Sequence, residues 1–196
     1  MAPAGPSLFG ALVPDGFHYR PDFISVAAEA SLATDLASLT FSDLEMRGVI
    51  AKRRVAFFGE SYDRESAGAM PGCLLPQRET VAAWARVVPE DFAMALVNEY
   101  RPGAPIGWHR DAPQYGIVAG ISMLAACRMK FRPYLRPGEP SPDGAPRRAT
   151  HEITLEPRSA YLMTGESRAA YEHHIPAVTE LRYSITFRTL RAKAAR

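Results

Sequence analysis

Two histidines and one aspartate stand at spacings that could bind a metal ion. His109 and Asp111 are separated by a single residue, and a second histidine, His173 or His174, follows later in the chain. Side chains alternate along an extended strand, so His109 and Asp111 would share one face while Arg110 points away. Two imidazoles and one carboxylate form the facial triad that holds Fe(II) and leaves positions open for oxygen chemistry. Because His-x-Asp also occurs by chance, the pattern gains weight only from the segments after it.

A run near the end of the chain, residues 182–188, is a second place where chemistry could reside. Alternation puts Arg182, Ser184, Thr186 and Arg188 on one face, and Tyr183, Ile185 and Phe187 on the other. At roughly 3.3 Å per residue the two arginine backbones stand about 20 Å apart, so their side chains would have to lean inward to hold one small dicarboxylate. The arginine fork matches a carboxylate in bidentate fashion. The same spacing also fits a half-exposed amphipathic strand, and both interpretations stay open.

Helix and strand patterns must supply the scaffold for these residues. Apolar spacing predicts a helix over residues 22–39, ended by Thr40-Phe41-Ser42, and another over about 78–87, with a turn or short helix from Pro89. Strands are predicted at 48–58, from about 93, and at 126–132, 151–156, 158–164, 171–176 and 182–190, with a proline-rich loop at 133–149. Helices followed by many short strands indicate an α+β fold with a β-sandwich or barrel core.

Composition bounds the class of protein. A chain of 196 residues with 47% hydrophobic content can bury one sizeable core, which predicts a single domain over residues 1–196. Residues 1–100 carry 8 Lys+Arg against 13 Asp+Glu, whereas residues 101–196 carry 15 against 8. This imbalance fits a polyanionic partner near the second half, although arginines that neutralise acids or lie on solvated faces would look the same.

The cysteines and the hydropathy of the chain indicate in which cellular compartment the protein is expected. Cys73 and Cys127 lie far apart and lack Cys-x-x-Cys spacing, so neither a disulfide framework nor a zinc site is indicated. No apolar run is long enough to span a membrane, and the first residues do not form a signal segment. We therefore expect a cytoplasmic protein without membrane contact, and a monomer.

Taken in order, these segments resemble one family, the AlkB-like Fe(II)/2-oxoglutarate dioxygenases. The resemblance rests on Asn98-Glu99-Tyr100-Arg101-Pro102-Gly103, Ile106-Gly107-Trp108-His109-Arg110-Asp111, Gly165-Glu166-Ser167-Arg168, Tyr171-Glu172-His173-His174-Ile175-Pro176 and the run Arg182 to Arg188. It implies a double-stranded β-helix (jelly-roll) core with N-terminal helices and a substrate lid, which the segment 54–62 is expected to begin. It also implies an enzyme, with Fe(II), 2-oxoglutarate and O2 as its cofactors.

The resemblance assigns a role to each matching residue. His109, Asp111 and His173 would be the catalytic iron ligands, because the register to Ile175-Pro176 is similar to the family's His-x-aliphatic-Pro. His174 would then be a surface or supporting residue.

The cosubstrate residues follow from the same motifs. Arg182, helped by Tyr100, would bind the distal carboxylate of 2-oxoglutarate, and Arg188 would lie near the carboxylate next to the metal. Asn98 would hydrogen-bond the cosubstrate or its neighbours. Ser184 stands where many members have asparagine, and its shorter side chain puts a direct cosubstrate contact in question.

The resemblance also suggests the substrate. It implies an oxidative demethylase or dealkylase of alkylated bases in nucleic acid, with an unstacked base held against aromatic side chains. Phe58, Tyr62 and Trp108 are the candidate substrate-binding residues, with Phe57 and Tyr115 as further wall candidates, although an aromatic residue of this kind is more often part of the core. Alternatives are the same chemistry on a protein or a tRNA modification, and a non-catalytic metal-binding jelly roll. His18 and His151 match no motif and are predicted to be ordinary surface residues.

Overall fold

Two antiparallel β-sheets form the body of the protein. The computed structural model describes residues 13–46, 49–60, 67–135 and 151–191. Its elements are β1 (Phe17–Arg20), α1 (Val26–Ala37), β2 (Ser42–Met46), β3 (Val49–Gly59), η1 (Gly72–Leu74), α2 (Leu75–Ala85), η2 (Pro89–Asp91), β4 (Phe92–Tyr100), β5 (Ile106–His109), β6 (Tyr115–Met123), β7 (Cys127–Pro133), β8 (His151–Leu155), β9 (Ser159–Met163), α3 (Gly165–Ala169), β10 (Tyr171–Ile175) and β11 (Arg182–Leu190).

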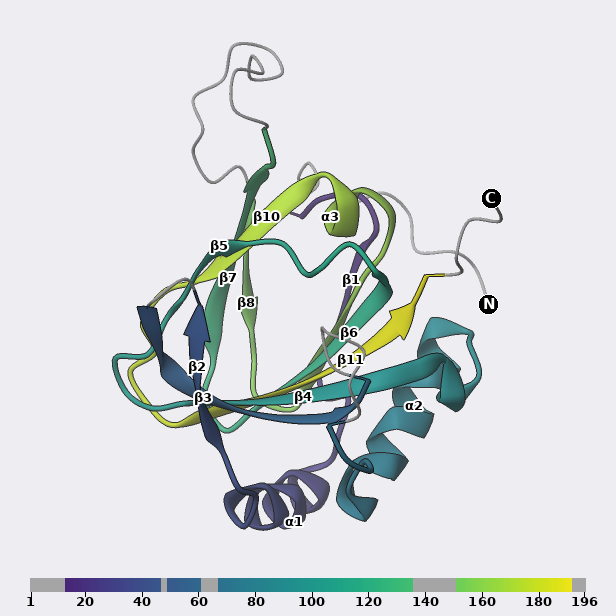
Figure 1. The fold of residues 1–196 in the computed structure, drawn as a ribbon, viewed down its shortest axis with the longest axis vertical. Coiled ribbons are helices and arrows are strands. Elements are labelled where there is room, and N and C mark those ends of the chain that lie inside the picture. The colour runs from purple at the N-terminus through teal and green to yellow at the C-terminus, as the bar shows by residue number, and fades with distance from the viewer. Residues whose placement is uncertain (1–12, 47–48, 61–66, 136–150, 192–196) are drawn as a thin grey trace.

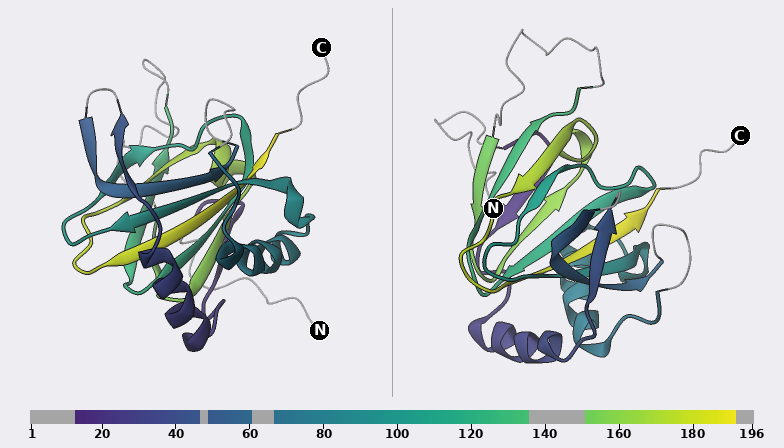
Figure 2. Two further views of the ribbon diagram at one scale, coloured as in Figure 1. Left: turned by 60° about the horizontal axis from the view of Figure 1, so that its bottom comes forward. Right: turned by 60° about the vertical axis from the view of Figure 1, so that its left-hand side comes forward.

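Strand order separates a large sheet from a small one. The seven-stranded sheet runs β1-β9-β6-β11-β4-β3-β2, and the four-stranded sheet runs β5-β10-β7-β8. Their faces are turned toward each other, as Figure 1 and the right-hand view of Figure 2 show. This is the arrangement expected of a double-stranded β-helix. The strands that carry the candidate residues thus lie on two opposing walls.

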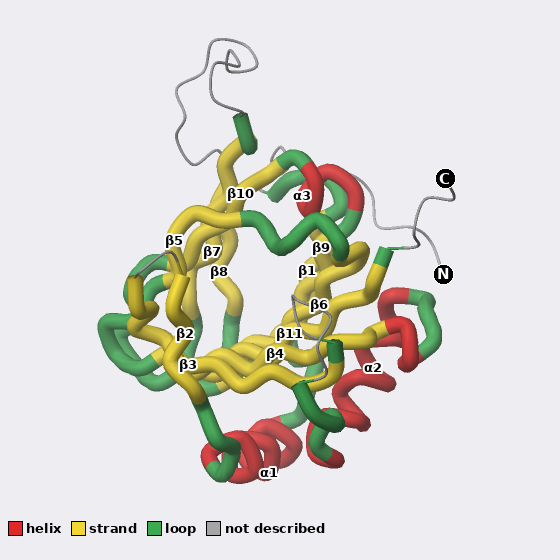
Figure 3. The backbone as a smooth tube through the Cα atoms, viewed as in Figure 1, coloured by secondary structure: helices red, strands yellow, loops and turns green. Residues whose placement is uncertain are grey.

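Two helices cover the outer face of the large sheet (Figure 3). In α1, Leu32 and Leu36 are buried in a core cluster with Val97, Ile185 and Phe187 of that sheet. The helix was predicted from residue 22, but Asp22 has a left-handed backbone (φ 47°) and the Ser25 side chain accepts the cap hydrogen bond from the Ala28 amide at 3.1 Å. Helix α1 therefore begins at Val26.

The second helix is displaced by about one turn from the prediction. It spans Leu75–Ala85 rather than 78–87, with Pro76 in its first turn and Arg86 left-handed at its end (φ 59°). Proline fits the first turn because the amide hydrogen that it lacks would have no helical partner there. No helix in the described part of the chain is long and apolar enough to cross a membrane.

Strand β11 lies at the centre of the large sheet, between β4 and β6. Every residue from Arg182 to Thr189 is buried. Tyr183, Ile185 and Phe187 face the helices, whereas the polar residues between them face the small sheet. The alternative of a half-exposed amphipathic strand is therefore wrong, because both faces of this strand are covered.

Three elements were missed by the sequence patterns. Strand β1 pairs with β9 (Phe17 with Met163), and β2 pairs with β3 (Ser42 with Val55) at the other edge of the large sheet. The short helix α3 follows β9 directly. The segment expected to begin a lid is an ordinary sheet strand as far as Gly59, paired with β4, and Tyr62 lies outside the described residues.

Candidate functional site

The three candidate iron ligands converge where β5 meets β10. His109 ends β5 and is the paired residue of His173 in β10, and their ring centroids are 4.2 Å apart. Asp111 follows β5 by two residues, and its Oδ2 lies 3.8 Å from the His173 Nε2. The sequence spacing alone could not show this meeting, because it depends on the pairing of two strands more than sixty residues apart.

Backbone contacts select the ring nitrogen that His109 can offer to a metal. The Nδ1 of His109 lies 2.9 Å from the Gly107 carbonyl oxygen, so Nδ1 carries the proton and donates it there. The Nε2 of His109 then keeps its lone pair. A histidine that donates its other N–H to a carbonyl is the usual arrangement of a metal-binding imidazole.

Burial and neighbouring charges set the ligands in the protonation state that a metal requires. Burial lowers the pKa of His109, and burial together with the neighbouring His109 lowers the pKa of His173 to about 3. Burial alone would raise the pKa of Asp111, but Arg188, followed by the two histidines, holds it well below its usual range. Neutral imidazoles and an ionised carboxylate are the forms that bind a cation.

The donor set fits Fe(II), although its atoms are not yet at bonding positions. Within the described residues, no three His, Cys, Asp or Glu side chains are already spaced to hold a metal ion. His109, Asp111 and His173 would be the residues that hold the metal. Two nitrogens and one carboxylate oxygen suit iron of the facial-triad type.

A cavity of about 600 Å³ opens onto these three side chains. Its lining comes from both sheets and includes Leu44, Arg53, Phe57, Leu96, Asn98, Tyr100, Ile106, Gly107, Trp108, His109, Arg110, Asp111, Ala112, Val118, Met129, Tyr161, Met163, His173, Ile175, Ser184, Thr186 and Arg188. Most of this wall is apolar or aromatic, and the polar residues in it include the three candidate ligands. Such a combination is typical of small-molecule sites.

Arg182 is fully buried next to Tyr100, which lines this cavity, and two of its nitrogens have no hydrogen-bond partner in the described part of the chain. Its Nε donates to the Ser122 hydroxyl at 3.1 Å, and its carbon Cζ stands 5.0 Å from the centre of the Tyr100 ring. The two terminal nitrogens, Nη1 and Nη2, have no hydrogen-bond partner among the described residues. A buried guanidinium normally pairs its donors, so these two fit the distal carboxylate of 2-oxoglutarate.

The remaining predicted cosubstrate residues line the cavity. Ser184 and Asn98 are paired residues of β11 and β4 and are both buried. The Asn98 Oδ1 accepts a hydrogen bond from the Arg53 Nε at 3.1 Å, which leaves its amide nitrogen to donate. Arg188 binds Asp111 through Nε at 2.8 Å and Nη2 at 2.7 Å, so its main contact is with the candidate metal ligand.

His174 faces away from the candidate ligands, as its place next to His173 on a strand requires. Its Nδ1 lies 2.7 Å from the Ile106 carbonyl oxygen, and its ring lies 5.1 Å from that of Trp108. Arg132 stacks on Trp108 with its Cζ 4.4 Å from the ring centre. Trp108 thus lies at the cavity edge, held by a histidine and an arginine.

The prediction for Phe58 was wrong by one residue. Phe58 packs against the core cluster under the helices, whereas Phe57 lines the cavity. Adjacent residues of β3 face opposite sides of the sheet, and the choice between them depends on a strand register that the residue types do not determine. Of the two unmatched histidines, His18 is exposed as predicted, but His151 is partly buried beside the Tyr171 ring at 5.6 Å.

Two cavity residues escaped the sequence patterns. Arg53 lines the cavity from β3, and Tyr161 lines it from β9. The tip of the Tyr161 ring lies directly over Gly120, where any β-carbon would overlap it. An isolated glycine within a predicted strand was the one signal that pointed to such a close approach.

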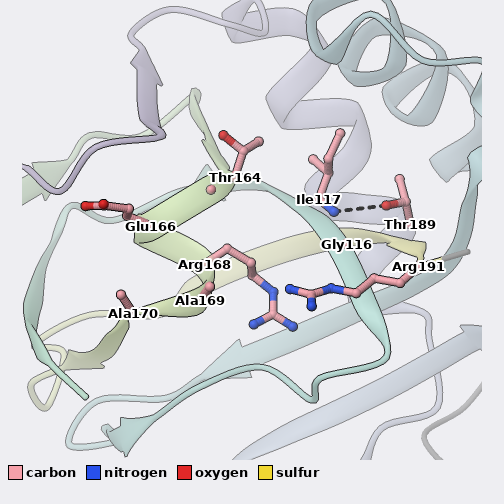
Figure 4. Close-up of a pocket in the computed structure, with 10 residues that line it drawn as sticks. Gly116, Ile117, Thr164, Glu166, Arg168, Ala169, Ala170, Thr189 and Arg191 are labelled. Carbon is pink, nitrogen blue, oxygen red and sulfur yellow. Dashed lines mark hydrogen bonds between the residues drawn. The ribbon is translucent and has the colours of Figure 1, made fainter. Parts of the chain in front are cut away.

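A second, more open cavity of about 520 Å³ lies beside α3 (Figure 4). Two arginines meet there. Arg168 donates from Nη2 to the carbonyls of Ala112 and Tyr115, and the Arg191 Nε donates to the same Tyr115 carbonyl at 3.1 Å. Because these donors hold the loop that follows Asp111, we interpret them as supports of that loop.

Comparison with known proteins identifies the family of this chain. The 2OG-Fe(II) oxygenase superfamily matches residues 45–188, and the chain belongs to this family. The predicted class of enzyme, an Fe(II)/2-oxoglutarate-dependent dioxygenase, and its cofactors Fe(II), 2-oxoglutarate and O2 are thereby confirmed. The alternative of a non-catalytic jelly roll has no support from this match.

Individual relatives show which members of the family this chain is similar to. An "Alkylated DNA repair protein ALKBH8 homolog" of Arabidopsis thaliana is 26% identical over 183 residues, covering 82% of this chain and 51% of that protein. A "Probable RNA/DNA demethylase ALKBH6" of Danio rerio is 26% identical over 171 residues, covering 85% of this chain and 72% of that protein. The chain thus spans about half the length of the first relative.

Solved structures confirm the jelly-roll fold. The structure of OsALKBH1 superposes with a TM-score of 0.64 at 13% identity, covering 90% of this chain and 99% of that one. A Pseudomonas putida prolyl-4-hydroxylase superposes with a TM-score of 0.58 at 12% identity, covering 91% and 94%. At these identities the likeness shows the fold alone.

Proposed function

We propose that this protein is an oxidative demethylase or dealkylase of alkylated bases in nucleic acid, dependent on Fe(II) and 2-oxoglutarate. The observation that carries the proposal is the cavity, whose apolar and aromatic walls end on His109, Asp111 and His173. An enzyme that acts on a base must hold it unstacked against such walls. The names of the two relatives, a DNA repair protein homolog and a probable RNA/DNA demethylase, support the same substrate class.

The chain's own residues would divide the work between cosubstrate and base. Arg182 and Tyr100 would hold the distal carboxylate of 2-oxoglutarate, and Ser184 and Asn98 would fix its middle. Phe57 and Leu96 would keep water from the reacting carbon, since both line the cavity. Fixing the reactants in this way is the protein's contribution to a reaction whose oxygen chemistry belongs to the cofactors.

Bound Fe(II), together with 2-oxoglutarate and O2, supplies the hydroxylation of a substrate C–H bond, while 2-oxoglutarate becomes succinate and carbon dioxide. On an N-methyl group the hydroxymethyl product falls apart to formaldehyde and the bare base. The walls must therefore hold the methyl carbon toward the three ligands during the reaction.

Basic side chains at the cavity rim could contact phosphates. Arg110 lies on the Tyr134 ring with its Cζ 3.4 Å from the centre, and Arg132 lies on Trp108. Arginine and aromatic planes together suit single-stranded nucleic acid, in which bases stack and phosphates remain accessible. Arg132 also pairs with Glu172 at 2.7 Å, so Arg110 is the stronger candidate for a phosphate contact.

Two measurements test the proposal. Purified protein with Fe(II) and 2-oxoglutarate should release succinate and formaldehyde when given a methylated single-stranded oligonucleotide, and the His109→Ala protein should not. Oligonucleotide binding should weaken with salt, with a slope of roughly −0.7 per neutralised phosphate. Arg110→Ala should reduce that slope by about one phosphate contact. Salt-independent or absent oligonucleotide binding, together with turnover on a protein extract, would contradict the proposal.

A further inference from the structure

Charges in the cavity wall are unevenly balanced. The charged side chains that line it are Arg53, Arg110, Asp111 and Arg188. Asp111 is held by Arg188 through two contacts under 3 Å, so the charges of this pair offset each other. Arg53 and Arg110 remain, and no further carboxylate belongs to the described lining. Next to the candidate metal ligands, the cavity therefore carries excess positive charge from the protein itself.

Arg53 is the residue that brings this charge inside. It is 8% exposed, and its Nε donates a hydrogen bond to the neutral amide oxygen of Asn98. No carboxylate in the described part of the chain forms an ion pair with it. A guanidinium has five N–H donors, and arginines are almost never this buried without a paired charge.

Its neighbour on the same strand shows the contrast. Arg54 faces the other side of the sheet and donates to both oxygens of Glu99, at 2.6 and 3.0 Å. The neighbouring strand β4 thus supplies a carboxylate, Glu99, to the arginine outside the cavity and a neutral amide, Asn98, to the arginine inside it. Arg53 lines the same cavity as His109, Asp111 and His173, so a substrate held in that cavity would meet its guanidinium.

We propose that Arg53 is a specificity-determining residue that selects a neutral or anionic substrate ring with an oxygen acceptor beside the reacting group, and disfavours cationic bases. This inference rests on the proposed function and narrows it. Bases such as 3-methylthymine and 3-methyluracil are neutral and carry carbonyl oxygens on both sides of the methylated nitrogen. By contrast, 3-methylcytosine and 1-methyladenine carry a positive charge in neutral solution.

The two classes would meet Arg53 differently. A carbonyl oxygen can accept a hydrogen bond from the guanidinium, which satisfies a donor with no partner among the described residues. A cationic ring would instead bring a second positive charge into a site of low dielectric constant, where repulsion is strong. Because 3-methylcytosine keeps one ring carbonyl, O2, beside the methylated nitrogen, the difference between the two bases comes from the second carbonyl, O4, and from the charge repulsion; together these correspond to a preference of about tenfold to hundredfold.

A matched pair of oligonucleotides tests the preference. The two single strands differ in one base, 3-methylthymine or 3-methylcytosine, which have nearly the same shape and place the methyl group on the same nitrogen. We would measure kcat/KM from formaldehyde release, and the Kd of each strand for the Mn(II)-substituted protein without O2. The neutral base should be preferred at least about tenfold in both measurements.

Substitutions in β3 of the protein test whether Arg53 causes the preference for the neutral base. Arg53→Met keeps the length of the side chain without its charge, and it should reduce the preference about tenfold or more, mainly by improving binding of the cationic base. Arg53→Lys keeps the charge and should retain discrimination against the cation. Lys52→Met is the matched control, because Lys52 is exposed on the same strand. The Kd for 2-oxoglutarate would be measured in parallel. A changed Kd would show that the substitution acts on the cosubstrate through Asn98, whereas an unchanged Kd would show that it acts on the base.

The outcomes distinguish the role of Arg53 from the proposed function on nucleic acid. If wild-type protein binds and demethylates both strands equally, or prefers 3-methylcytosine, the inference is overturned while the proposed function stands. An unchanged preference in Arg53→Met overturns the role of Arg53. If neither strand is bound or demethylated, the nucleic-acid function and this inference fall together.

Discussion

Two nitrogens of the Arg188 guanidinium contact the same carboxylate oxygen of Asp111. Its Nε and Nη2 lie 2.8 and 2.7 Å from the same Oδ1, while the other oxygen, Oδ2, points toward His173. Arg188 and Asp111 come from the end of β11 and from the loop after β5, so this contact ties the two sheets together beside the candidate metal site. Asp111 is thereby prepared to offer a single oxygen to a metal.

The first prediction concerns this pair. Arg188→Met should weaken metal binding and lower the free energy of unfolding by about 3–5 kcal/mol, because it leaves a buried carboxylate without its partner. Arg188→Lys should restore part of both, since one ammonium cannot reproduce the planar fork. Mn(II) titration and denaturant unfolding would measure the two effects. Arg128→Met, on an exposed arginine paired with Glu152 outside the cavity, should leave Mn(II) affinity unchanged.

The second prediction concerns the choice between adjacent histidines. Alanine at His109, Asp111 or His173 should abolish both turnover and Mn(II) binding, because each removes one ligand of the triad. His174→Ala should keep metal binding and lose only the contacts to Ile106 and Trp108. Loss of metal in His174→Ala with retention in His173→Ala would show that the register is wrong by one residue.

The sequence was most informative where residue type and spacing act locally. The alternation along residues 182–188 needed only strand geometry, and it holds in the structure. Asp111 was expected on the same strand as His109, but β5 ends at His109, so Asp111 reaches the site from the loop that follows. The burial of β11 on both faces could not be read from its own pattern, because it depends on helices and a second sheet supplied by other parts of the chain. Arg182 shows this most clearly, since its surroundings make it a fully buried cation.

Long-range register was the part that sequence could not supply. Phe57 and Phe58 are equivalent by type, and pairing of β3 with β4 decides which of them reaches the cavity. Arg53 looked like one of several basic residues, because only the fold places it opposite the metal ligands. Strand β1 is four residues long and too short for a periodic pattern to stand out.

The third prediction follows from the lowered pKa of His173. Folding favours its neutral form, so between about pH 6.5 and 3 the unfolded chain binds a proton that the folded protein excludes. The free energy of unfolding of the metal-free protein should therefore fall as the pH is lowered through this window, by up to about 1.4 kcal/mol per pH unit for this group. Above pH 6.5 the group should contribute no slope.

Denaturant unfolding at a series of pH values would test this, with His173→Gln as the comparison. The variant cannot take up the proton, so its stability should fall less steeply between pH 6.5 and 4. The carboxylate of Asp111 acts in the same direction but mainly below about pH 4, where its unfolded form becomes protonated. Equal slopes for the wild-type and variant proteins would contradict the assignment of a buried neutral imidazole.

The last prediction separates ligand binding from stability at Arg182. Arg182→Met should weaken 2-oxoglutarate binding by about 2–5 kcal/mol, because the distal carboxylate loses its charged partner. In the cosubstrate-free protein the same change removes two buried nitrogens that have no partner among the described residues, so it should cost little stability or even raise it. Calorimetric titration of 2-oxoglutarate into Mn(II)-substituted protein and unfolding without ligand would measure the two terms. Unchanged affinity for 2-oxoglutarate would remove Arg182 from the cosubstrate site, and a large loss of stability without ligand would mean that the guanidinium serves the fold rather than the dicarboxylate.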